Sequence, residues 1–143
     1  MATIRDIVER TFSAVEAKDT DAVVRLFADD AVLIDPHYPT PRMVGKAAIA
    51  EGLRWAFTSM KTFGFTMVNF FPSEDGQSAA VEMETHHVLK GGMKLDFPQA
   101  FVIELRDGLV TRLQAYEPYG PGGIGGFILK LTRLKRKLSR KGA

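Results

Sequence analysis

The sequence predicts an α+β domain in which helices come first and a long antiparallel sheet follows. Up to about residue 62 the apolar residues recur mostly at helical spacing, and from Phe63 onward they alternate as in strands. Turn signals separate the alternating segments at residues 74–76, 91–92 and 107–108. Helices followed by hairpin-connected strands are typical of the α+β class.

Two helices are expected at the start of the chain. In residues 3–17 six positions follow the helical period, namely Ile4, Ile7, Val8, Thr11, Phe12 and Val15. Asp19 or Thr20 can cap a second helix, DAVVRLFA, over residues 21–28.

A short strand and a third helix complete the first half. The segment AVLID, residues 31–35, alternates as a strand and ends in a carboxylate just before Pro36. After a proline-rich loop, residues 45–60 have the pattern of a helix that ends near residues 62–64.

Four strands are expected in the second half, at residues 63–71, 78–90, 93–105 and 109–119. In the third of these the odd positions are apolar apart from Gln99, so the odd face is predicted to be the inner one. By the same alternation His87 is predicted to face inward. In the last strand the residues predicted to face inward are Leu109, Thr111, Leu113, Ala115 and Glu117. Polar groups are therefore expected on inner faces at Asp35, His87, Gln99 and Glu117.

Composition limits the class of protein. A chain of 143 residues with 45% hydrophobic residues suits one domain with one core. It has no cysteine, which excludes disulfides, a thiolate nucleophile and a cysteine zinc site. The charged start MATIRDIVER and the absence of a long apolar run indicate a cytoplasmic protein.

The positive charge is confined to the end of the sequence. Seven of the 19 Lys and Arg residues lie in residues 130–141, so residues 1–129 hold 12 basic and 17 acidic residues, a net charge of −5. The body therefore shows no sign of a nucleic-acid surface. Apolar residues recur every three or four positions in the same tail, at Ile124, Phe127, Ile128, Leu131, Leu134 and Leu138.

This tail, residues 120–143, is predicted to be a glycine-rich hinge at 120–126 followed by an amphipathic basic helix. The helix can dock on the body or on a partner subunit, or residues 124–141 can touch an anionic membrane. The segment GPGGIG within the hinge matches a dinucleotide-binding spacing, but no second parallel strand or acidic residue follows it, so no cofactor is predicted.

The order of elements, together with LFADDAVLIDP and GKAAI, resembles the nuclear transport factor two-like superfamily and, within it, ketosteroid isomerase. The resemblance covers residues 4–119 and is strongest up to Ile49. It implies a cone-shaped fold in which a strongly bent sheet packs against three helices and encloses a pocket. It also implies a homodimer and a small apolar ligand.

The resemblance implies particular site residues. Asp35 falls on the position of the isomerase's proton-shuttling aspartate, whereas Thr11 replaces its oxyanion tyrosine and Gln99 or Ala100 its oxyanion acid. Gln99 can still donate an N–H to a developing oxyanion. The positions of an epoxide hydrolase's charged residues read Glu84, His86 and Ala115, which disfavours epoxide opening.

Each candidate has a structural explanation beside the functional one. Asp35 could simply hydrogen-bond the following turn, His87 could be a core histidine, and Glu117 could reach water at its strand end. His37 is isolated in the sequence, so no metal site is predicted. Apolar ligand contacts are expected from Thr11, Tyr38, Trp55, Phe65, Met67, Phe97 and Phe101.

The sequence thus favours an enzyme that transfers protons on an apolar carbonyl compound. Asp35 would take and return the proton, Gln99 would donate to the oxygen, and His87 or Glu117 would assist. The alternatives are a SnoaL-like polyketide cyclase and a non-catalytic binding or assembly module.

Overall fold

The computed structural model describes residues 1–117 and 123–142, and the side chains of 1–117 and 127–142. The elements are α1 (Ile4–Glu16), α2 (Thr20–Arg25), β1 (Phe27–Ile34), β2 (Arg42–Val44), α3 (Lys46–Ser59), β3 (Met60–Thr62), β4 (Phe65–Pro72), β5 (Ser78–Leu89), β6 (Lys94–Arg106), β7 (Leu109–Tyr116) and α4 (Gly123–Lys141). The predicted α+β order is confirmed.

The first two helices begin at capping residues. The Thr3 hydroxyl accepts from the backbone of Asp6, whose carboxylate accepts from Thr3 in return. Asp19 caps α2, which ends at Arg25, so the prediction of a helix over residues 21–28 was too long. Phe27 instead begins β1, because it pairs with Val110 of β7 in the sheet.

The sheet has seven strands in the order β2-β1-β7-β6-β5-β3, with β4 also paired to β5. β1 runs parallel to β7, and the other pairs are antiparallel. The sequence did not predict β2 and β3. Each is three residues long, too short to show an alternating pattern.

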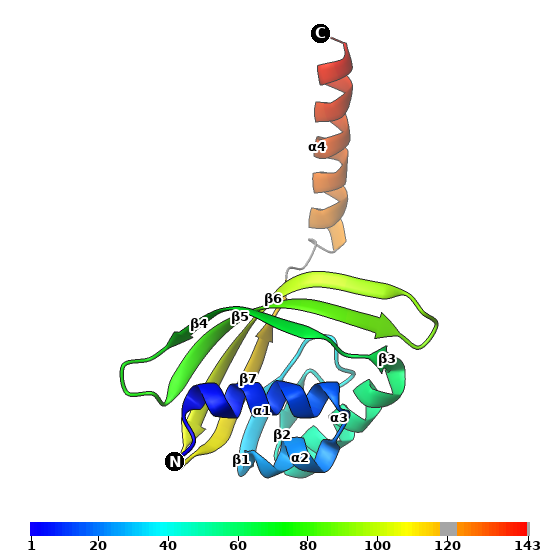
Figure 1. Cartoon of the computed structure of the whole chain (residues 1–143). Coiled ribbons are helices and arrows are strands. Elements are labelled where there is room, and N and C mark those ends of the chain that lie inside the picture. Colours follow the sequence, from blue (N-terminus) through cyan, green and yellow to red (C-terminus); the bar gives the residue numbers. More distant parts are fainter. Residues whose placement is uncertain (118–122, 143) are drawn as a thin grey trace.

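The sheet is strongly bent, and register shifts in several strand pairs help to bend it. One shift lies between Glu104 and Leu105, opposite the start of β7. There Leu109 is exposed and Val110 fully buried, so the prediction that Leu109 faces inward was wrong. Figure 1 shows the sheet curled over α1, α2 and α3 in the expected cone.

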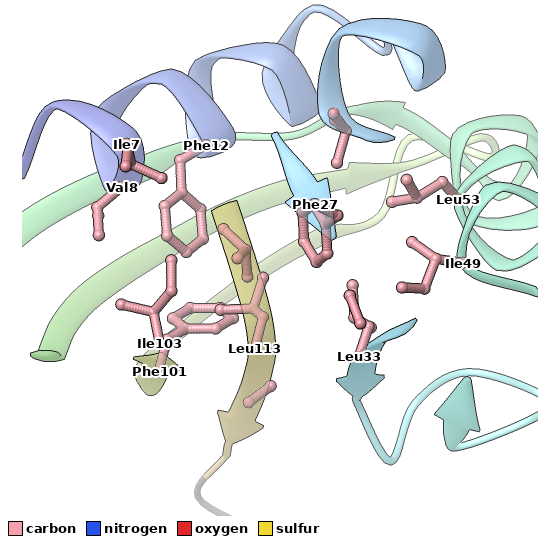
Figure 2. Close-up of a cluster of buried hydrophobic side chains, with 14 of the residues drawn as sticks. Ile7, Val8, Phe12, Phe27, Leu33, Ile49, Leu53, Phe101, Ile103 and Leu113 are labelled. Atoms are coloured by element: carbon pink, nitrogen blue, oxygen red, sulfur yellow. The ribbon is translucent and has the colours of Figure 1, made fainter. Parts of the chain in front are cut away.

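The core lies between the helices and the concave face of this sheet. Figure 2 shows Ile7, Val8 and Phe12 of α1 above side chains of β6 and β7, with those of β1 and α3 farther along the same core. Phe12 packs edge to face on Phe101, with ring centroids 4.7 Å apart. This packing fixes the strands whose ends carry the polar residues described below.

The final helix, α4, stands away from the sheet in Figure 1. It begins at Gly123, so the second half of the expected hinge at 120–126 is helical, while its first part lies in residues 118–122, outside the described ones. Among the described residues no helix is both long and apolar enough to cross a membrane.

Candidate active site

A cavity of about 570 Å³ lies between the concave face of the sheet and the helices. Its wall is mostly apolar, as is usual for small-molecule sites of this size. All but one of the predicted site residues line it: Thr11, Asp35, Tyr38, Trp55, Phe65, His87, Phe97, Gln99, Phe101 and Glu117. That these residues bind a ligand stays a prediction.

Met67 is the exception, because it does not line the cavity. It lies on β4 half-buried against the core, and its sulfur is 3.6 Å from a guanidinium nitrogen of Arg5. The alternation of β4 places Met67 on the inner side of the sheet, but α1 covers that position.

Asp35 opens the polar end of the cavity. It follows the last residue of β1, and its Oδ1 accepts the backbone N–H of His37 at 3.0 Å. Its own N–H donates to the Pro41 carbonyl at 2.9 Å, and its carbonyl accepts from Tyr38 at 3.1 Å. The carboxylate therefore makes the turn contact that a structural explanation predicts, and it lines the cavity as well.

A chain of hydrogen bonds leads across the sheet to Glu117. The Thr85 hydroxyl on β5 donates to Gln99 Oε1 at 2.8 Å, and Gln99 Nε2 on β6 donates to Glu117 Oε1 at 2.6 Å. All three residues are buried. In this orientation the Gln99 amide nitrogen holds the carboxyl group of Glu117 with one of its two N–H groups.

Asp35 and Glu117 form a pair of carboxyl groups at this end. Burial, the largest cause, acts together with the charge and the hydrogen bond of Asp35 to raise the pKa of Glu117 from its ordinary value of 4.5 to about 8, while the bond from Gln99 acts in the opposite direction. Burial also raises the pKa of Asp35 above its ordinary value. The hydrogen bond between the two carboxyl groups raises the pKa of Glu117 and lowers that of Asp35, so within the pair Glu117 holds a proton more strongly than Asp35.

His37 is the residue that the sequence interpretation missed. Its Nδ1 contacts Glu117 Oε2, and one possible ligand atom from each of Asp35, His37 and Glu117 lies within 4.8 Å of the others. The prediction that His37 is isolated was wrong, because the turn after β1 brings it back over the end of β7. The only available signal was its place two residues after Asp35.

This trio has the residue types of a metal site, and two of its carboxylate oxygens already accept hydrogen bonds, whereas the buried Oε2 of Glu117 accepts none from the described residues. Glu117 Oε1 accepts from Gln99, Oε2 contacts His37, and Asp35 Oδ1 accepts a backbone N–H. No fourth His, Asp or Glu joins the three within the part of the chain that the structure describes. The geometry is that of a hydrogen-bonded acid pair with a neighbouring histidine.

Tyr38 and Trp55 form the wall beside the acid pair, with ring centroids 5.8 Å apart. Burial raises the pKa of Tyr38 above its ordinary range, and the charges of Asp35 and Glu117 add to this, so the phenol stays neutral. Gly52 on α3 makes room for this arrangement. A Cβ there would lie 2.3 Å from the Met43 sulfur and 3.2 Å from the Tyr38 ring.

His87 lies in the cavity wall among aromatic rings. Its ring is 4.9 Å from Phe63, 5.0 Å from Phe65 and 6.3 Å from Phe97, measured between centroids. The backbone N–H of Gly64 donates to its Nδ1 at 3.3 Å. Burial lowers the pKa of His87 to about 4, with the charge of His86 as a smaller cause.

The neutral His87 has a defined tautomer. Because Nδ1 accepts the Gly64 N–H, the ring proton is assigned to Nε2, which can donate to a ligand oxygen. A ring with so low a pKa does not act as a cationic acid at neutral pH. The Thr11 hydroxyl, in contrast, already donates to the Ile7 carbonyl at 2.7 Å and offers the cavity mainly its methyl group.

Comparisons with known proteins agree with this fold. A family model described as a SnoaL-like domain matches residues 8–113. No curated protein matches the chain. Among solved structures, a Mycobacterium tuberculosis protein in complex with estradiol-17beta-hemisuccinate is 20% identical, with a TM-score of 0.72 over 82% of this chain and 95% of that one.

Two further similar structures are described as putative polyketide cyclases. The one from Pseudomonas putida is 19% identical, with a TM-score of 0.69 over 82% of this chain and 93% of that one. The one from Sinorhizobium meliloti is 25% identical, with a TM-score of 0.65 over 78% of this chain and 94% of that one. The fold expected from the resemblance to ketosteroid isomerase is confirmed.

Proposed function

Because this chain belongs to the SnoaL-like domain family, we propose that it is an acid–base enzyme that transfers protons on an apolar carbonyl compound. One observation carries the proposal: two carboxyl groups, Asp35 and Glu117, lie together at the polar end of a mostly apolar cavity. Such a pair supplies a base and an acid at the same pH, because each carboxyl group changes the pKa of the other.

In the proposed reaction Asp35 takes a proton from the carbon next to the substrate carbonyl. The electron pair of the broken C–H bond forms a C=C bond, the π pair of the carbonyl moves onto its oxygen, and Glu117 donates its proton to that oxygen, so an enol forms. Asp35 then returns its proton to carbon while Glu117 recovers its own. The net change is a moved or exchanged proton, and the protein ends in its starting state.

Two other side chains have positioning and binding roles in this scheme. Gln99, expected from the sequence to donate to the substrate oxygen, instead orients Glu117 through its Nε2–H. His87 donates from Nε2 to a second oxygen of the ligand, elsewhere on the cavity wall. The Phe97 ring stands between His87 and His37, 6.3 Å from the first and 6.4 Å from the second.

The substrate class follows from the cavity. Its volume of about 570 Å³ and its aromatic wall suit a rigid molecule of several fused rings with few polar atoms. The Mycobacterium tuberculosis protein of the same fold, in complex with a steroid ester, supports this class at the level of fold.

The test is the exchange of carbon-bound protons with solvent, which can be measured without knowing the natural substrate. Wild-type protein is incubated in D₂O with 2-decalone, a fused-ring ketone, and deuterium at the carbons next to the carbonyl is followed by NMR. We expect catalysed exchange that Asp35→Asn reduces by about 10²- to 10⁴-fold, the usual share of a general base. The matched control is Asp29→Asn, on the strand β1 that precedes Asp35 but fully exposed, which should exchange like wild type.

Ligand entry can be measured separately. The chain has one tryptophan, and Trp55 lines the cavity, so its fluorescence should change when 2-decalone binds. Binding by both wild type and Asp35→Asn, with exchange by wild type alone, is the expected result. Binding by both proteins without exchange by either would contradict catalysis of this kind and favour a non-catalytic binding module.

A second candidate is polyketide cyclisation, favoured by the two putative cyclases of the same fold. It uses the same first step, because an enol formed by Asp35 and Glu117 can attack a second carbonyl of the same molecule. A linear polyketone as substrate separates the two functions: cyclisation forms a carbon–carbon bond that closes a ring and turns the attacked carbonyl into a hydroxyl group, whereas isomerisation only moves a proton.

Dimerisation belongs to the same proposal. Val68 and Phe71 of β4 are 52% and 54% exposed, and burial of such side chains against a second copy would stabilise a homodimer. Sedimentation analysis of the full chain should give twice the chain's mass of 15.8 kDa. A monomer at every concentration would contradict it.

A further inference from the structure

The helix α4 exposes a row of apolar side chains. Phe127, Leu131, Leu134 and Leu138 follow steps of four, three and four residues, which places them on one face of the helix. They are 63%, 47%, 53% and 61% exposed, respectively. In the described part of the chain this row is therefore not docked on the body, which was one of the positions that the sequence left open, beside a partner subunit and a membrane.

The rest of the α4 surface is cationic. Residues 130–141 contain seven Lys and Arg residues, and residues 123–141 contain no Asp or Glu. Its two hydroxyl groups bond within the helix, from Thr132 to the Ile128 carbonyl and from Ser139 to the Arg136 carbonyl. No ion pair joins these basic residues to the described part of the chain.

We propose that α4 is a membrane-surface helix that binds bilayers containing anionic lipid. An apolar row beside a dense positive face fits the boundary between acyl chains and negative headgroups, where the basic side chains extend toward the headgroups. The helix lies on the surface and does not cross it, since no described helix is long and apolar enough to cross.

The charge and the apolar row of α4 together favour an anionic bilayer over a nucleic acid or a second α4 as its binding partner. A nucleic acid would satisfy the basic residues but would leave Phe127, Leu131, Leu134 and Leu138 in water. A second α4 would cover the apolar row but would bring seven more positive charges and no acid. An anionic bilayer pairs the basic residues with its headgroups and buries the apolar row among its acyl chains.

The charge of the body gives the bound protein an orientation. Residues 1–129 carry a net charge of −5, so an anionic surface repels the body while it attracts α4. We expect the body to face the solvent with α4 on the lipid. This proposal does not depend on the chemistry in the cavity.

The test is co-sedimentation of the full chain with vesicles of phosphatidylcholine, with and without phosphatidylglycerol. Wild type should sediment with the anionic vesicles alone and should be released by salt on the order of 1 M, where the Debye length is about 3 Å. The variant Lys130→Gln/Lys135→Gln/Lys137→Gln should bind about 100-fold more weakly, at about fivefold for each charge removed. The matched control removes three exposed lysines of the body, Lys61→Gln/Lys90→Gln/Lys94→Gln, and should bind at least as well as wild type.

A second variant tests the apolar row. Leu134→Gln/Leu138→Gln keeps all seven charges and should lose most binding, because the lost burial is apolar. Unchanged binding by this variant, equal losses in the two lysine variants, or no sedimentation of wild type would each overturn the proposal. So would tighter binding to a DNA duplex than to anionic vesicles, which would assign α4 to nucleic acid.

Discussion

The amide nitrogen Nε2 of Gln99 lies 2.6 Å from Oε1 of Glu117, while Oε1 of the same amide accepts from Thr85 at 2.8 Å. This relationship holds the carboxyl group of Glu117 in one orientation from the strand next to its own. It also favours the ionised form of Glu117, against the burial and the Asp35 charge that favour the protonated form.

Replacement of Gln99 by Met should therefore raise the pKa of Glu117 further. The lost hydrogen bond, typically about 1 kcal/mol or more, corresponds to an upward shift of about one pH unit in the alkaline limb of the exchange rate. The measurement is the pH profile of α-proton exchange. Gln114→Met, on β7 outside the cavity, should leave the limb in place, and a limb that does not move in Gln99→Met would contradict the role of Gln99.

The stability of the protein should also depend on Glu117. Because its pKa is raised on folding, from 4.5 to about 8, the folded state binds more protons than the unfolded state in this range. Its contribution is fully present below pH 4.5 and is lost as the pH rises through 8, at up to about 1.4 kcal/mol per pH unit.

Urea unfolding of wild type and Glu117→Gln from acid to alkaline pH measures this contribution. The free energy of unfolding of the variant, relative to wild type, should increase as the pH rises. Glu84→Gln, which removes an exposed carboxylate of β5, is the control and should follow wild type. Parallel curves for wild type and Glu117→Gln would show that the Glu117 pKa is ordinary.

Gly64 should be needed to place His87. A Cβ at residue 64 would lie 2.6 Å from the His86 backbone oxygen, so Gly64→Ala must separate the chain at this point from β5. We expect a loss of about 1–3 kcal/mol of stability and weaker binding of 2-decalone by Trp55 fluorescence. Gly91→Ala, where a Cβ meets nothing within 4 Å, should be nearly neutral, and equal effects in the two variants would contradict the account.

His87 should remain neutral in the folded protein down to about pH 4. Since its pKa is lowered on folding from 6.5, it opposes folding in acid, and this loss of stability begins as the pH falls below 6.5. The ¹⁵N NMR signals of the ring should show a protonated Nε2 and an unprotonated Nδ1 at neutral pH. The spectrum of His87→Gln assigns the signals, and a proton on Nδ1 would exclude the Gly64 contact.

The strand pattern predicted most of the site because alternate side chains of a strand point to opposite faces of the sheet. When only one face is exposed to solvent, the alternation therefore tells which side chains are buried. His87, Gln99 and Glu117 were found as polar residues at inner positions, and all three are buried in the structure. The prediction for Leu109 was wrong because a register shift opposite the start of β7 turns its side chain outward. No single-strand pattern contains such a shift, since it arises between strands.

The contacts of the loop residues could not be predicted in this way. His37 lies in a turn, where no period relates position to direction, and its contact with Glu117 joins residues 80 positions apart in the chain. The partner of Gln99 was missed for a related reason. The alternation within β6 predicted that Gln99 faces inward. The bond from its amide to Glu117 depends on the pairing of β6 with β7, which the pattern of one strand does not contain.

The most direct test of the acid pair is a ¹³C NMR titration of the side-chain carboxyl groups of Asp35 and Glu117. In wild type Glu117 should titrate near pH 8, and in Asp35→Asn its pKa should be lower but still above 4.5, because the neighbouring negative charge is gone while the burial remains. Titration of Glu117 at about 4.5 in both proteins would contradict the shared proton, and with it the assignment of Asp35 as base and Glu117 as acid.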